Sequence, residues 1–450
     1  MGAAYLSVCG SLTTVSCSKQ ATRPNIIFLL TDDQRWDALG CTGNPIIKTP
    51  NMDFLANNGI RFANAFVTTP ICAASRASLF TGLYERKHSY TFTKPPIKQE
   101  YILNSYPYLL RQAGYRTGFV GKFGVKVEDG AKEKMFDEFE SSAYPYFKMV
   151  DGERKHLTDI NMDRAILFIR SGNQEQPFCL SISTWAPHAH DSEEEQYFCP
   201  IACNELYKNV VIPEPELSDP AFFEALPEFV KNSLNRKRWY WRFDTPEKYQ
   251  KMVKGYYRMI SGVDMALGRL ITELQKLGLD QNTIIILMGD NGYFLGERGF
   301  AGKWTMHDRS IRVPMIIYDP RQPEKARGKA INEMALNIDL TPTFLELAGV
   351  SIPASYQGYS LIPLIKGKTT KWRSEILTEH LWDREDIPQT EAIRTEQWKY
   401  IRYLKHSEYE ELYDLKNDPN EGVNLAQLPD YFGVLEKMRT RCDESFKAIK

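Results

Sequence analysis

The sequence has no long hydrophobic run and no excess of charge of either sign. No stretch of 18 or more apolar residues occurs, which excludes a transmembrane helix. Lys and Arg together number 56 and Asp and Glu 57, giving a net charge of -1. This balance excludes a globally basic surface of the kind that binds nucleic acid. If the protein binds an anion, the positive charge must be concentrated inside a pocket.

Cysteine is also sparse, and no zinc-binding spacing is present. Eight cysteines in 450 residues are too few for a scaffold built on disulfides. No paired CxxC motif and no HExxH motif occurs. Cys199 and Cys203 are near enough in sequence to form a disulfide in an irregular loop, a point that the sequence leaves open. Internal repeats are absent, and the length favours one large domain with a smaller one.

The first twenty residues differ in composition from the rest of the chain. They are small, mildly apolar and rich in hydroxyl groups, with Lys19 as their one charge. This composition is typical of the end of an export signal, so residues 1–21 predict an exported protein, periplasmic or at the cell surface. Residues 14–17 resemble a bacterial lipoprotein cleavage site, which would place a lipid on Cys17. The alternative is a disordered tail.

The pattern of short apolar runs predicts an α/β fold. Runs without alternation, typical of strands buried on both faces, occur at residues 25–30, 117–120, 178–182, 284–288 and 315–318. Helical patterns lie between them, at residues 51–58, 106–113, 159–169 and 257–277. We therefore expect a large, mostly parallel mixed sheet sandwiched by helices over residues 22–355.

Two further segments depart from this pattern. Strand-like runs at residues 391–395, 398–402 and 411–415, followed by a helical pattern over residues 431–450, predict a smaller α+β subdomain over residues 356–450. Residues 199–242 are rich in proline and aromatic residues and are interpreted as a long surface excursion and a candidate wall of the active site. The basic cluster at residues 235–238 within it is interpreted as a solvated face.

Acidic residues follow two of the predicted strands. Asp32 and Asp33 come directly after the first strand, and Asp290 and Asn291 follow the strand at residues 284–288. Ligands of open α/β sheets bind at the carboxyl ends of strands, so these side chains are expected to converge. Carboxylate and amide oxygens suit Ca²⁺ or Mg²⁺. The alternative is that both groups are ordinary turn residues.

A possible nucleophile and several cations complete the set of candidates. Residues 72–82 read as a helix that opens at Cys72 and ends at Gly82. A helix start favours anions and lowers the pKa of a cysteine placed there, although a buried structural thiol is the alternative. Lys122, His188 and Lys303 follow strands or lie near the acidic candidates, which favours an anion-binding role over ordinary solvated or loop positions.

The segment from Cys72 to Gly82 resembles the signature of the type I sulfatases of the alkaline phosphatase superfamily. Cys72-Ala73-Ala74-Ser75-Arg76 matches Cys-x-Pro/Ala-x-Arg and is followed by Thr81-Gly82. The family's other marks occur in order from about residue 23 onward: Asp32-Asp33, Gly121-Lys122, Pro187-His188, Gly289-Asp290-Asn291-Gly292, Lys303, Ile311-Arg312-Val313-Pro314 and Glu411-Leu412-Tyr413-Asp414-Leu415.

The resemblance implies a mechanism. Cys72 would be oxidised to formylglycine by a separate maturation enzyme; one hydroxyl of its hydrate would attack sulfur, and the other would later expel sulfate. A Ca²⁺ ion, or alternatively Mg²⁺, would be held by the modified Cys72 together with Asp32, Asp33, Asp290 and Asn291. Arg76 would hold the formylglycine. Lys122, His188 and Lys303 would neutralise the sulfate, with His188 or Lys303 as the proton donor to the leaving group.

The chain departs from the family at one position. The family usually reads Gly-Lys-Trp-His where this sequence has Gly121-Lys122-Phe123-Gly124. The histidine that contacts the formylglycine diol is therefore replaced by Gly124. Lys126, His88, His307 or water are the candidates to take its place.

The expected substrate is a sulfated carbohydrate. Trp304 is a candidate for stacking on a sugar, and His307, Asp308 and Arg309 are candidates for binding hydroxyls or a carboxylate; the alternative is loop packing and a surface ion pair. Two other functions stay open. One is a phosphodiesterase or phosphonate monoester hydrolase of the same superfamily, and the other is a catalytically impaired glycan-binding protein.

Overall fold

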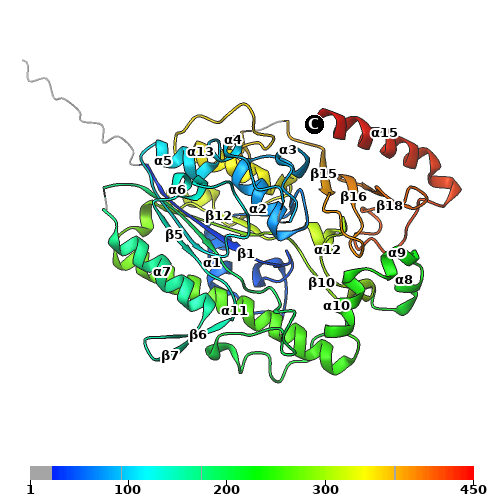
Figure 1. The fold of residues 1–450 in the computed structure, drawn as a ribbon, viewed down its shortest axis with the longest axis horizontal. Helices are drawn as coiled ribbons and strands as arrows, with labels where there is room; N and C mark the ends of the chain where they lie inside the picture. Colours follow the sequence, from blue (N-terminus) through cyan, green and yellow to red (C-terminus); the bar gives the residue numbers. More distant parts are fainter. Residues whose placement is uncertain (1–22, 93, 174, 369–370, 450) are drawn as a thin grey trace, which may run out of the picture.

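The computed structural model describes residues 23–92, 94–173, 175–368 and 371–449, and Figure 1 shows its ribbon. The predicted export segment and Cys17 lie outside the described residues. Within the described residues, no helix is both long and apolar enough to cross a membrane.

The centre of the molecule is an eight-stranded sheet. Its order is β13-β2-β12-β9-β1-β8-β4-β5, and β12 runs antiparallel to both of its neighbours while the other adjacent pairs are parallel. The strands are β13 (Lys329–Ile331), β2 (Ile60–Phe62), β12 (Met315–Tyr318), β9 (Thr283–Gly289), β1 (Asn25–Thr31), β8 (Phe178–Ser183), β4 (Arg116–Gly121) and β5 (Glu138–Ser141). The predicted mixed, mostly parallel sheet is confirmed.

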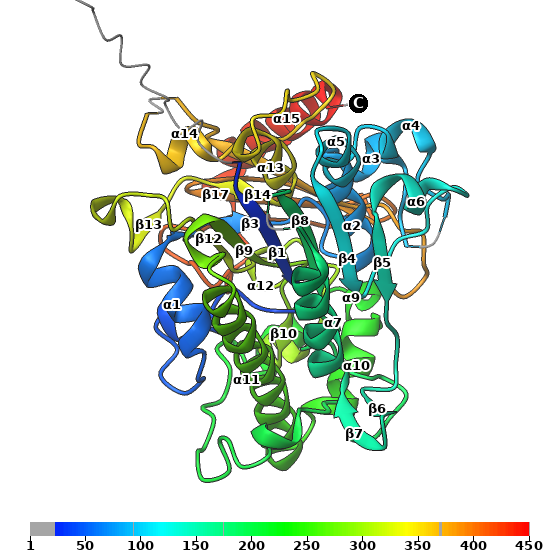
Figure 2. The ribbon, with the colours of Figure 1, turned by 90° about the vertical axis from the view of Figure 1, so that its left-hand side faces the viewer.

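Helices cover both faces of this sheet because its central strands are apolar on both sides. In β1, Ile26 and Phe28 enter one hydrophobic cluster and Ile27 and Leu29 enter the other. The first face carries α2 (Cys72–Thr81), α5 (Tyr106–Gln112) and α13 (Leu340–Leu347), and the second carries α1 (Pro50–Asn58), α7 (Leu157–Ser171) and α11 (Pro246–Lys276). Figure 2 shows α7 and α11 running side by side.

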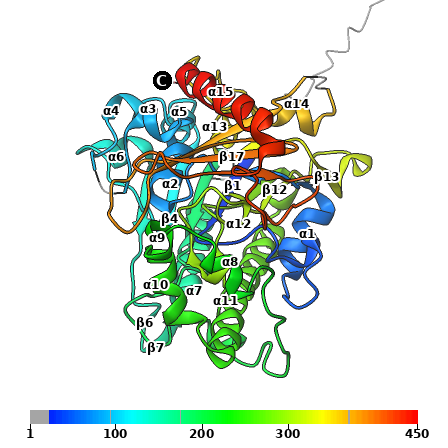
Figure 3. The same ribbon diagram turned by 90° about the vertical axis from the view of Figure 1, so that its right-hand side faces the viewer.

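The C-terminal part is a four-stranded antiparallel sheet covered by a long helix (Figure 3). Its elements are β15 (Glu375–His380), β16 (Thr390–Thr395), β17 (Trp398–Tyr403), β18 (Glu410–Asp414) and α15 (Phe432–Ala448). The three predicted strands and the closing helix are confirmed, and β15 was not predicted. The boundary near residue 355 stays a prediction.

Shorter elements connect these parts. They are β3 (Ala65–Phe66), β6 (Phe147–Val150), β7 (Glu153–His156), β10 (Phe294–Leu295), β11 (Ala301–Gly302), β14 (Ala335–Leu336), α3 (Glu85–His88), α4 (Gln99–Ile102), α6 (Ala131–Met135), α8 (Pro220–Glu224), α9 (Glu228–Lys231), α10 (Leu234–Arg242), α12 (Asp308–Ile311) and α14 (Ile362–Ile365).

The segment at residues 199–242 differs from its prediction in two respects. It contains α8, α9 and α10, and the basic cluster at residues 235–238 is not simply solvated, because Asn235 and Arg238 are buried. Arg238 forms an ion pair with Asp191, which lies outside this segment, so the composition of residues 199–242 alone does not indicate the partner. Cys199 and Cys203 are free thiols in the structure.

Candidate active site

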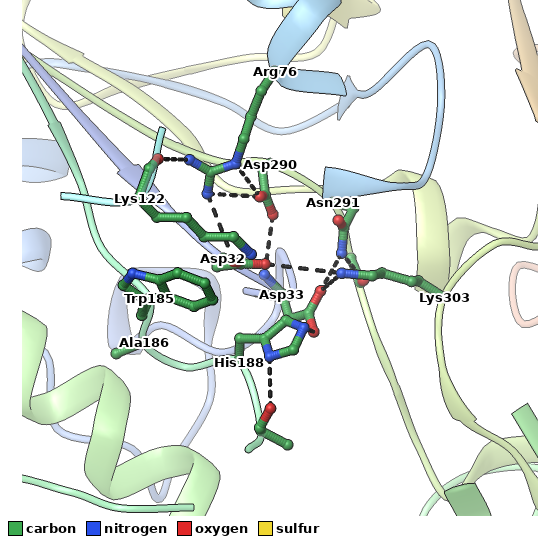
Figure 4. A network of polar contacts seen from close by, with 12 residues as sticks. Asp32, Asp33, Arg76, Lys122, Trp185, Ala186, His188, Asp290, Asn291 and Lys303 are labelled. Carbon is green, nitrogen blue, oxygen red and sulfur yellow. Dashed lines mark hydrogen bonds and ion pairs between the residues drawn. The ribbon is translucent and has the colours of Figure 1, made fainter. Parts of the chain in front are cut away.

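The carboxyl ends of four adjacent parallel strands, β9, β1, β8 and β4, meet at one edge of the sheet. The backbone ties the residues that follow them together: the Asp290 N–H donates to Thr31 O at 2.9 Å, and the Lys122 N–H donates to Ser183 O at 2.8 Å. Residues distant in sequence are thereby fixed side by side. The expected convergence of Asp32, Asp33 and Asp290 at this edge is confirmed (Figure 4).

Each carboxylate of this group faces a cation. Asp32 contacts the Lys122 ammonium, and Asp33 contacts the Lys303 ammonium. The Arg76 guanidinium lies 2.8 Å from an oxygen of Asp290 and 3.7 Å from Asp32. All of these side chains are buried, so the charges are held in a low-dielectric environment and act strongly on one another.

The pKa values of Asp32, Asp290 and Lys303 show how strongly these buried charges act on one another. Burial alone would raise the pKa of Asp32, but the surrounding cations, led by Lys122, outweigh it and hold that pKa well below the ordinary value. For Asp290, burial and the neighbouring Asp32 together outweigh the cations and raise the pKa to about 6. Burial would lower the pKa of Lys303, yet the attraction of Asp33 raises it. The site therefore favours a further positive charge beside Asp290.

Two oxygen atoms in this cluster lack a hydrogen-bond partner among the described residues. They are Asp32 Oδ1 and Asn291 Oδ1, and both are buried. The Asn291 amide donates to Asp33 at 2.6 Å, which leaves its oxygen free. Buried oxygens without donors are costly unless a cation binds them. The residues present thus fit Ca²⁺ or Mg²⁺, both of which take oxygen ligands.

Asp32, Asp33 and His188 also offer ligand atoms within 4.8 Å of one another. His188 lies with its Nε2 3.7 Å from Asp33, and its Nδ1 is 2.6 Å from Ala189 O and 2.9 Å from the Tyr144 hydroxyl. A carbonyl only accepts, so Nδ1 carries the hydrogen and Nε2 is the free atom. Burial lowers the pKa of His188 to about 4. Because hard cations prefer oxygen, we assign His188 to the cavity rather than to the cation.

Cys72 and Arg76 lie on one face of α2, one turn apart. The helix begins at Cys72 and ends before Gly82, whose left-handed backbone (φ 69°) and bond to Ser78 O cap it, as predicted. The Arg76 guanidinium donates to Asp290 at 2.9 Å, to Lys122 O at 2.6 Å and to the Ser183 hydroxyl. Arg76 therefore links α2 to three strand ends.

A side chain in place of Gly124 would disturb the contacts that Arg76 makes with the strand ends. Its φ is +71°, and a Cβ there would lie 2.8 Å from Arg76 Cδ. A histidine at position 124 would thus require both a strained backbone and a shift of Arg76. Of the proposed substitutes, Lys126 lines the cavity described below. His88 is buried between Ser78 and Tyr90, and His307 lies against Glu411, so neither histidine lines the cavity.

A cavity of about 540 Å³ opens above the cluster. Cys72, Lys122, His188, Lys303 and Trp304 all line it, which brings the predicted nucleophile and the predicted cations to one space. Trp304 is 6% exposed, and Arg238 lies 4.6 Å from its ring centre. One face of the indole is therefore covered by a guanidinium, which limits the surface available to a sugar.

The other three predicted substrate residues do not line this cavity. Asp308 is buried against Arg394 and Lys399 of the C-terminal sheet, and His307 pairs with Glu411 there at 3.1 Å. Arg309 pairs with Asp37 and Glu216 at 2.6 and 2.7 Å. The loop-packing alternative is thus correct for these residues. Their proximity in sequence to Lys303 was misleading because the chain turns away from the cavity after Trp304.

Several lining residues were not predicted at all. They come from separate loops and are Tyr90, Phe92, Trp185, Asp191, Trp382 and Arg384. Arg238 of α10 was assigned to a solvated face. The one signal in the sequence was the aromatic and basic character of residues 199–242; the other loops carry no motif, so only the fold brings them together.

A candidate nucleophile, an oxygen-rich candidate cation site and several basic side chains are features expected of a hydrolase for anionic esters. Comparison with known proteins supports this class. The sulfatase family model matches residues 24–350, and a model described as N-sulphoglucosamine sulphohydrolase, C-terminal, matches residues 296–448. The first match covers more than half of the chain, and the protein therefore belongs to the sulfatase family.

Individual relatives and a solved structure agree with this family assignment. An N-acetylglucosamine-6-O-sulfatase of Bacteroides thetaiotaomicron is 28% identical over 98% of this chain and 90% of its own length. The extracellular sulfatase SULF-1 homolog of Drosophila melanogaster is 30% identical over 91% of this chain and 38% of its own length. A solved structure in complex with its substrate D-glucosamine-2-N,6-O-disulfate has a TM-score of 0.81 at 27% identity, covering 95% of this chain and 98% of that one.

A phosphonate monoester hydrolase from Silicibacter pomeroyi has a TM-score of 0.80 at 20% identity, covering 95% of this chain and 96% of that one. At this identity the likeness supports the fold alone. The predicted sulfatase family, fold class and enzymatic class are confirmed by these comparisons together with the family match.

Proposed function

We propose that this protein is a sulfuric ester hydrolase that removes sulfate from a sulfated carbohydrate, with a formylglycine derived from Cys72 as its nucleophile. The observation that carries the proposal is the shared cavity. The Cys72 side chain opens into the same hollow as Lys122, His188 and Lys303, above the buried carboxylates. A dianionic transition state formed there would be surrounded by fixed positive charge.

The formylglycine, made by a separate maturation enzyme, would supply a hydrated aldehyde with two hydroxyls, and a Ca²⁺ or Mg²⁺ ion would supply Lewis acidity. Asp32, Asp33, Asp290 and Asn291 would hold the ion. Arg76 bridges the helix to Asp290 and so keeps residue 72 in position over the cation site.

The basic side chains divide the remaining work. Lys122 and Lys303 project into the cavity from different strand ends and would bind the non-bridging sulfate oxygens. His188 has a free Nε2 on the cavity side, held in place by Ala189 and Tyr144 through Nδ1. His188 could give the leaving group a proton only after taking one up at Nε2, whereas the Lys303 ammonium already carries one, so these two residues are the alternative proton donors.

A carbohydrate substrate is supported by the relatives and by the cavity. The relatives named above include an N-acetylglucosamine-6-O-sulfatase, and the similar structure holds a disulfated glucosamine. The cavity combines exposed aromatic rings with charged groups and is large enough for a saccharide unit. Trp304 would offer the sugar only a small area, because it is 6% exposed and Arg238 covers one face of its ring.

The test is sulfate release by protein made in a host that carries the maturation enzyme. Cys72→Ala should abolish release from sulfated saccharides while the circular dichroism spectrum and the melting temperature stay close to wild type. Cys41→Ala is the matched control, since Cys41 is a free thiol that is not among the residues lining the cavity. Undiminished release by Cys72→Ala would overturn the nucleophile assignment.

The superfamily alternative is tested on the same preparation. A sulfate monoester and a phosphate diester with the same leaving group are compared by kcat/KM. We expect the sulfate ester to be preferred, and preference for the diester would assign the protein to phosphodiester or phosphonate ester hydrolysis.

We also propose that the protein is exported to the periplasm or the cell surface, on the composition of residues 1–20. Cell fractionation of the full chain tests this, and recovery in the cytosol alone would contradict it.

A further inference from the structure

The cavity carries more positive charge than one sulfate group needs. Five cationic residues line it in the described chain, against a single carboxylate: Lys122, Lys126, Arg238, Lys303 and Arg384, with Asp191. Two of the cations lie at the base and are paired with Asp32 and Asp33, and Arg238 is paired with Asp191. The remaining two, Lys126 and Arg384, come from loops at the mouth.

Lys126 is exposed, and no ion pair or side-chain hydrogen bond of its ammonium is found among the described residues. Its backbone is nevertheless fixed. The Lys126 N–H donates to the Tyr90 hydroxyl at 2.9 Å, and Lys126 O accepts from the Ile97 N–H at 2.9 Å. Tyr90 is 1% exposed, so the anchor is buried. The loop therefore holds an unneutralised cation at the cavity wall.

An aromatic pair connects this lysine to the second cation. The Tyr90 hydroxyl donates to Phe92 O at 3.0 Å, and the Phe92 ring stacks on Trp382 with centroids 4.6 Å apart and planes at 20°. Phe92 remains 36% exposed. The Arg384 guanidinium lies 5.3 Å from the Trp382 ring centre. Rings of this kind suit the apolar face of a sugar.

The positive charge of Arg384 is only partly neutralised by its ion pair. It forms an ion pair with Asp386, but Asp386 also forms an ion pair with Lys237 at 3.2 Å, so two cations share one carboxylate. The Arg384 side chain is 42% exposed and lines the same cavity as Lys126. Asp191, the one carboxylate in the lining, is held by both Arg238 and Arg242. Nothing else in the described lining opposes an anion at the mouth.

We propose that Lys126 and Arg384, with the Phe92–Trp382 pair, form a second anion subsite at the mouth of the cavity. The substrate is then a saccharide that carries a second anionic group, a sulfate or a carboxylate, besides the sulfate ester that is cleaved. This inference rests on the proposed function, because it takes the base of the cavity as the site of the scissile sulfate. Lys126 was a candidate to replace the usual histidine at the formylglycine diol, and this proposal assigns it to substrate specificity instead of to the chemical steps.

The test is calorimetric binding to the Cys72→Ala protein, which does not consume its ligand. Three saccharides are compared: one with a single sulfate, the same sugar with a second sulfate, and the monosulfated sugar linked to a uronic acid. We expect a doubly anionic ligand to bind about five- to tenfold more tightly than the monosulfated one. Whichever doubly anionic ligand binds best identifies the second group as sulfate or carboxylate.

Lys126→Gln and Arg384→Gln, each in the Cys72→Ala background, should remove most of this difference and leave binding of the monosulfated sugar unchanged. Lys134→Gln is the matched control, since Lys134 is exposed and lies outside the cavity lining. Equal affinity for all three saccharides, or an equal loss for all three in Lys126→Gln, would contradict the proposal.

The mature protein separates this result from the proposed function. If it releases sulfate from mono- and doubly anionic sugars with equal kcat/KM and Lys126→Gln changes neither, the sulfatase function stands and the subsite is wrong. If it releases none, while binding keeps a preference that depends on Lys126, the subsite stands and the function is wrong. A lower kcat on every substrate in Lys126→Gln would instead place Lys126 in the chemical steps and also overturn the proposal.

Discussion

Arg76 joins more parts of the site than any other single side chain considered above. It is 1% exposed, and its guanidinium contacts Asp290, Lys122 O and Ser183, while its aliphatic stem packs beneath Gly124. In this structure Gly124 leaves room for the stem of Arg76, and a side chain at position 124 would have to displace that stem.

Gly124→His should therefore lower kcat/KM for sulfate release rather than raise it, because the new Cβ would meet Arg76 Cδ at 2.8 Å. Steady-state kinetics of sulfate release measure the effect. Gly130→His is the control: Gly130 also has a positive φ, of +75°, but no atom lies within 4 Å of a Cβ there. An increase in kcat/KM for Gly124→His would show that the usual histidine fits and assists.

His88 offers a pH-dependent test at the same scale. It is buried, with Nε2 3.0 Å from the Ser78 hydroxyl and Nδ1 accepting from the Tyr90 N–H at 3.0 Å. Burial lowers its pKa to about 3 from an ordinary value of 6.5. The unfolded chain therefore takes up the proton first, so the stability linked to neutral His88 is fully present above pH 6.5 and is lost as the pH falls toward 3.

His88→Gln removes this titration. Between pH 7 and pH 5 the free energy of unfolding of the wild type should fall by about 2 kcal/mol relative to that of His88→Gln. Urea unfolding at the two pH values measures the difference. A gap between the two proteins that does not change with pH would show that His88 is not held neutral.

At the scale of elements, the proposed cation site lies at the ends of β1 and β9. Their last residues, Thr31 and Gly289, are register partners, and each strand is followed by oxygen ligands. Binding of Ca²⁺ by the proposed ligands would tie the two strand ends together in the folded state alone, so it should stabilise the protein by linkage.

Removing divalent cations with a chelator should therefore abolish sulfate release and lower the melting temperature, and adding Ca²⁺ should restore both. With Ca²⁺ at about one hundred times its dissociation constant, the gain would be about 2.7 kcal/mol. Scanning calorimetry measures it. Asn291→Ala should reduce the rise in melting temperature on adding Ca²⁺, and Asn58→Ala, at the end of α1, should leave that rise unchanged. Full activity after exhaustive chelation would contradict the cation site.

The elements that were predictable are those whose local sequence determines them. The apolar runs of β1, β4, β8, β9 and β12 and the glycine at the end of α2 mark their structures directly. The residues that follow the strands were found for the same reason. Arg238 and Trp382 were not, because their place in the cavity depends on how α10 and the loop after β15 fold back over α2, which no local pattern encodes.

At the scale of the whole molecule, the catalytic sheet and the C-terminal sheet are joined by buried charges. Lys399 of β17 is fully buried and contacts both Asp308 and Glu421, and Arg394 of β16 pairs with Asp308 at 3.1 Å. Asp308 and its neighbour His307, expected at the substrate, belong to this interface. Trp382 and Arg384 follow β15, so the same interface positions one wall of the cavity.

Lys399→Met should destabilise the protein by about 3 to 5 kcal/mol, because it leaves two buried carboxylates without their common cation. Thermal unfolding gives the comparison. Lys405→Met is the control, since Lys405 pairs with Asp383 at an exposed site and its loss should be nearly neutral. Equal effects of the two substitutions would show that the interface does not depend on this charge network.

The most direct test of the account is the mass of the peptide that contains Cys72, in protein purified from a host able to mature it and shown to release sulfate. We predict that residue 72 carries an aldehyde in place of its thiol, in proportion to the specific activity. An active preparation in which residue 72 is wholly an unmodified cysteine would contradict the account.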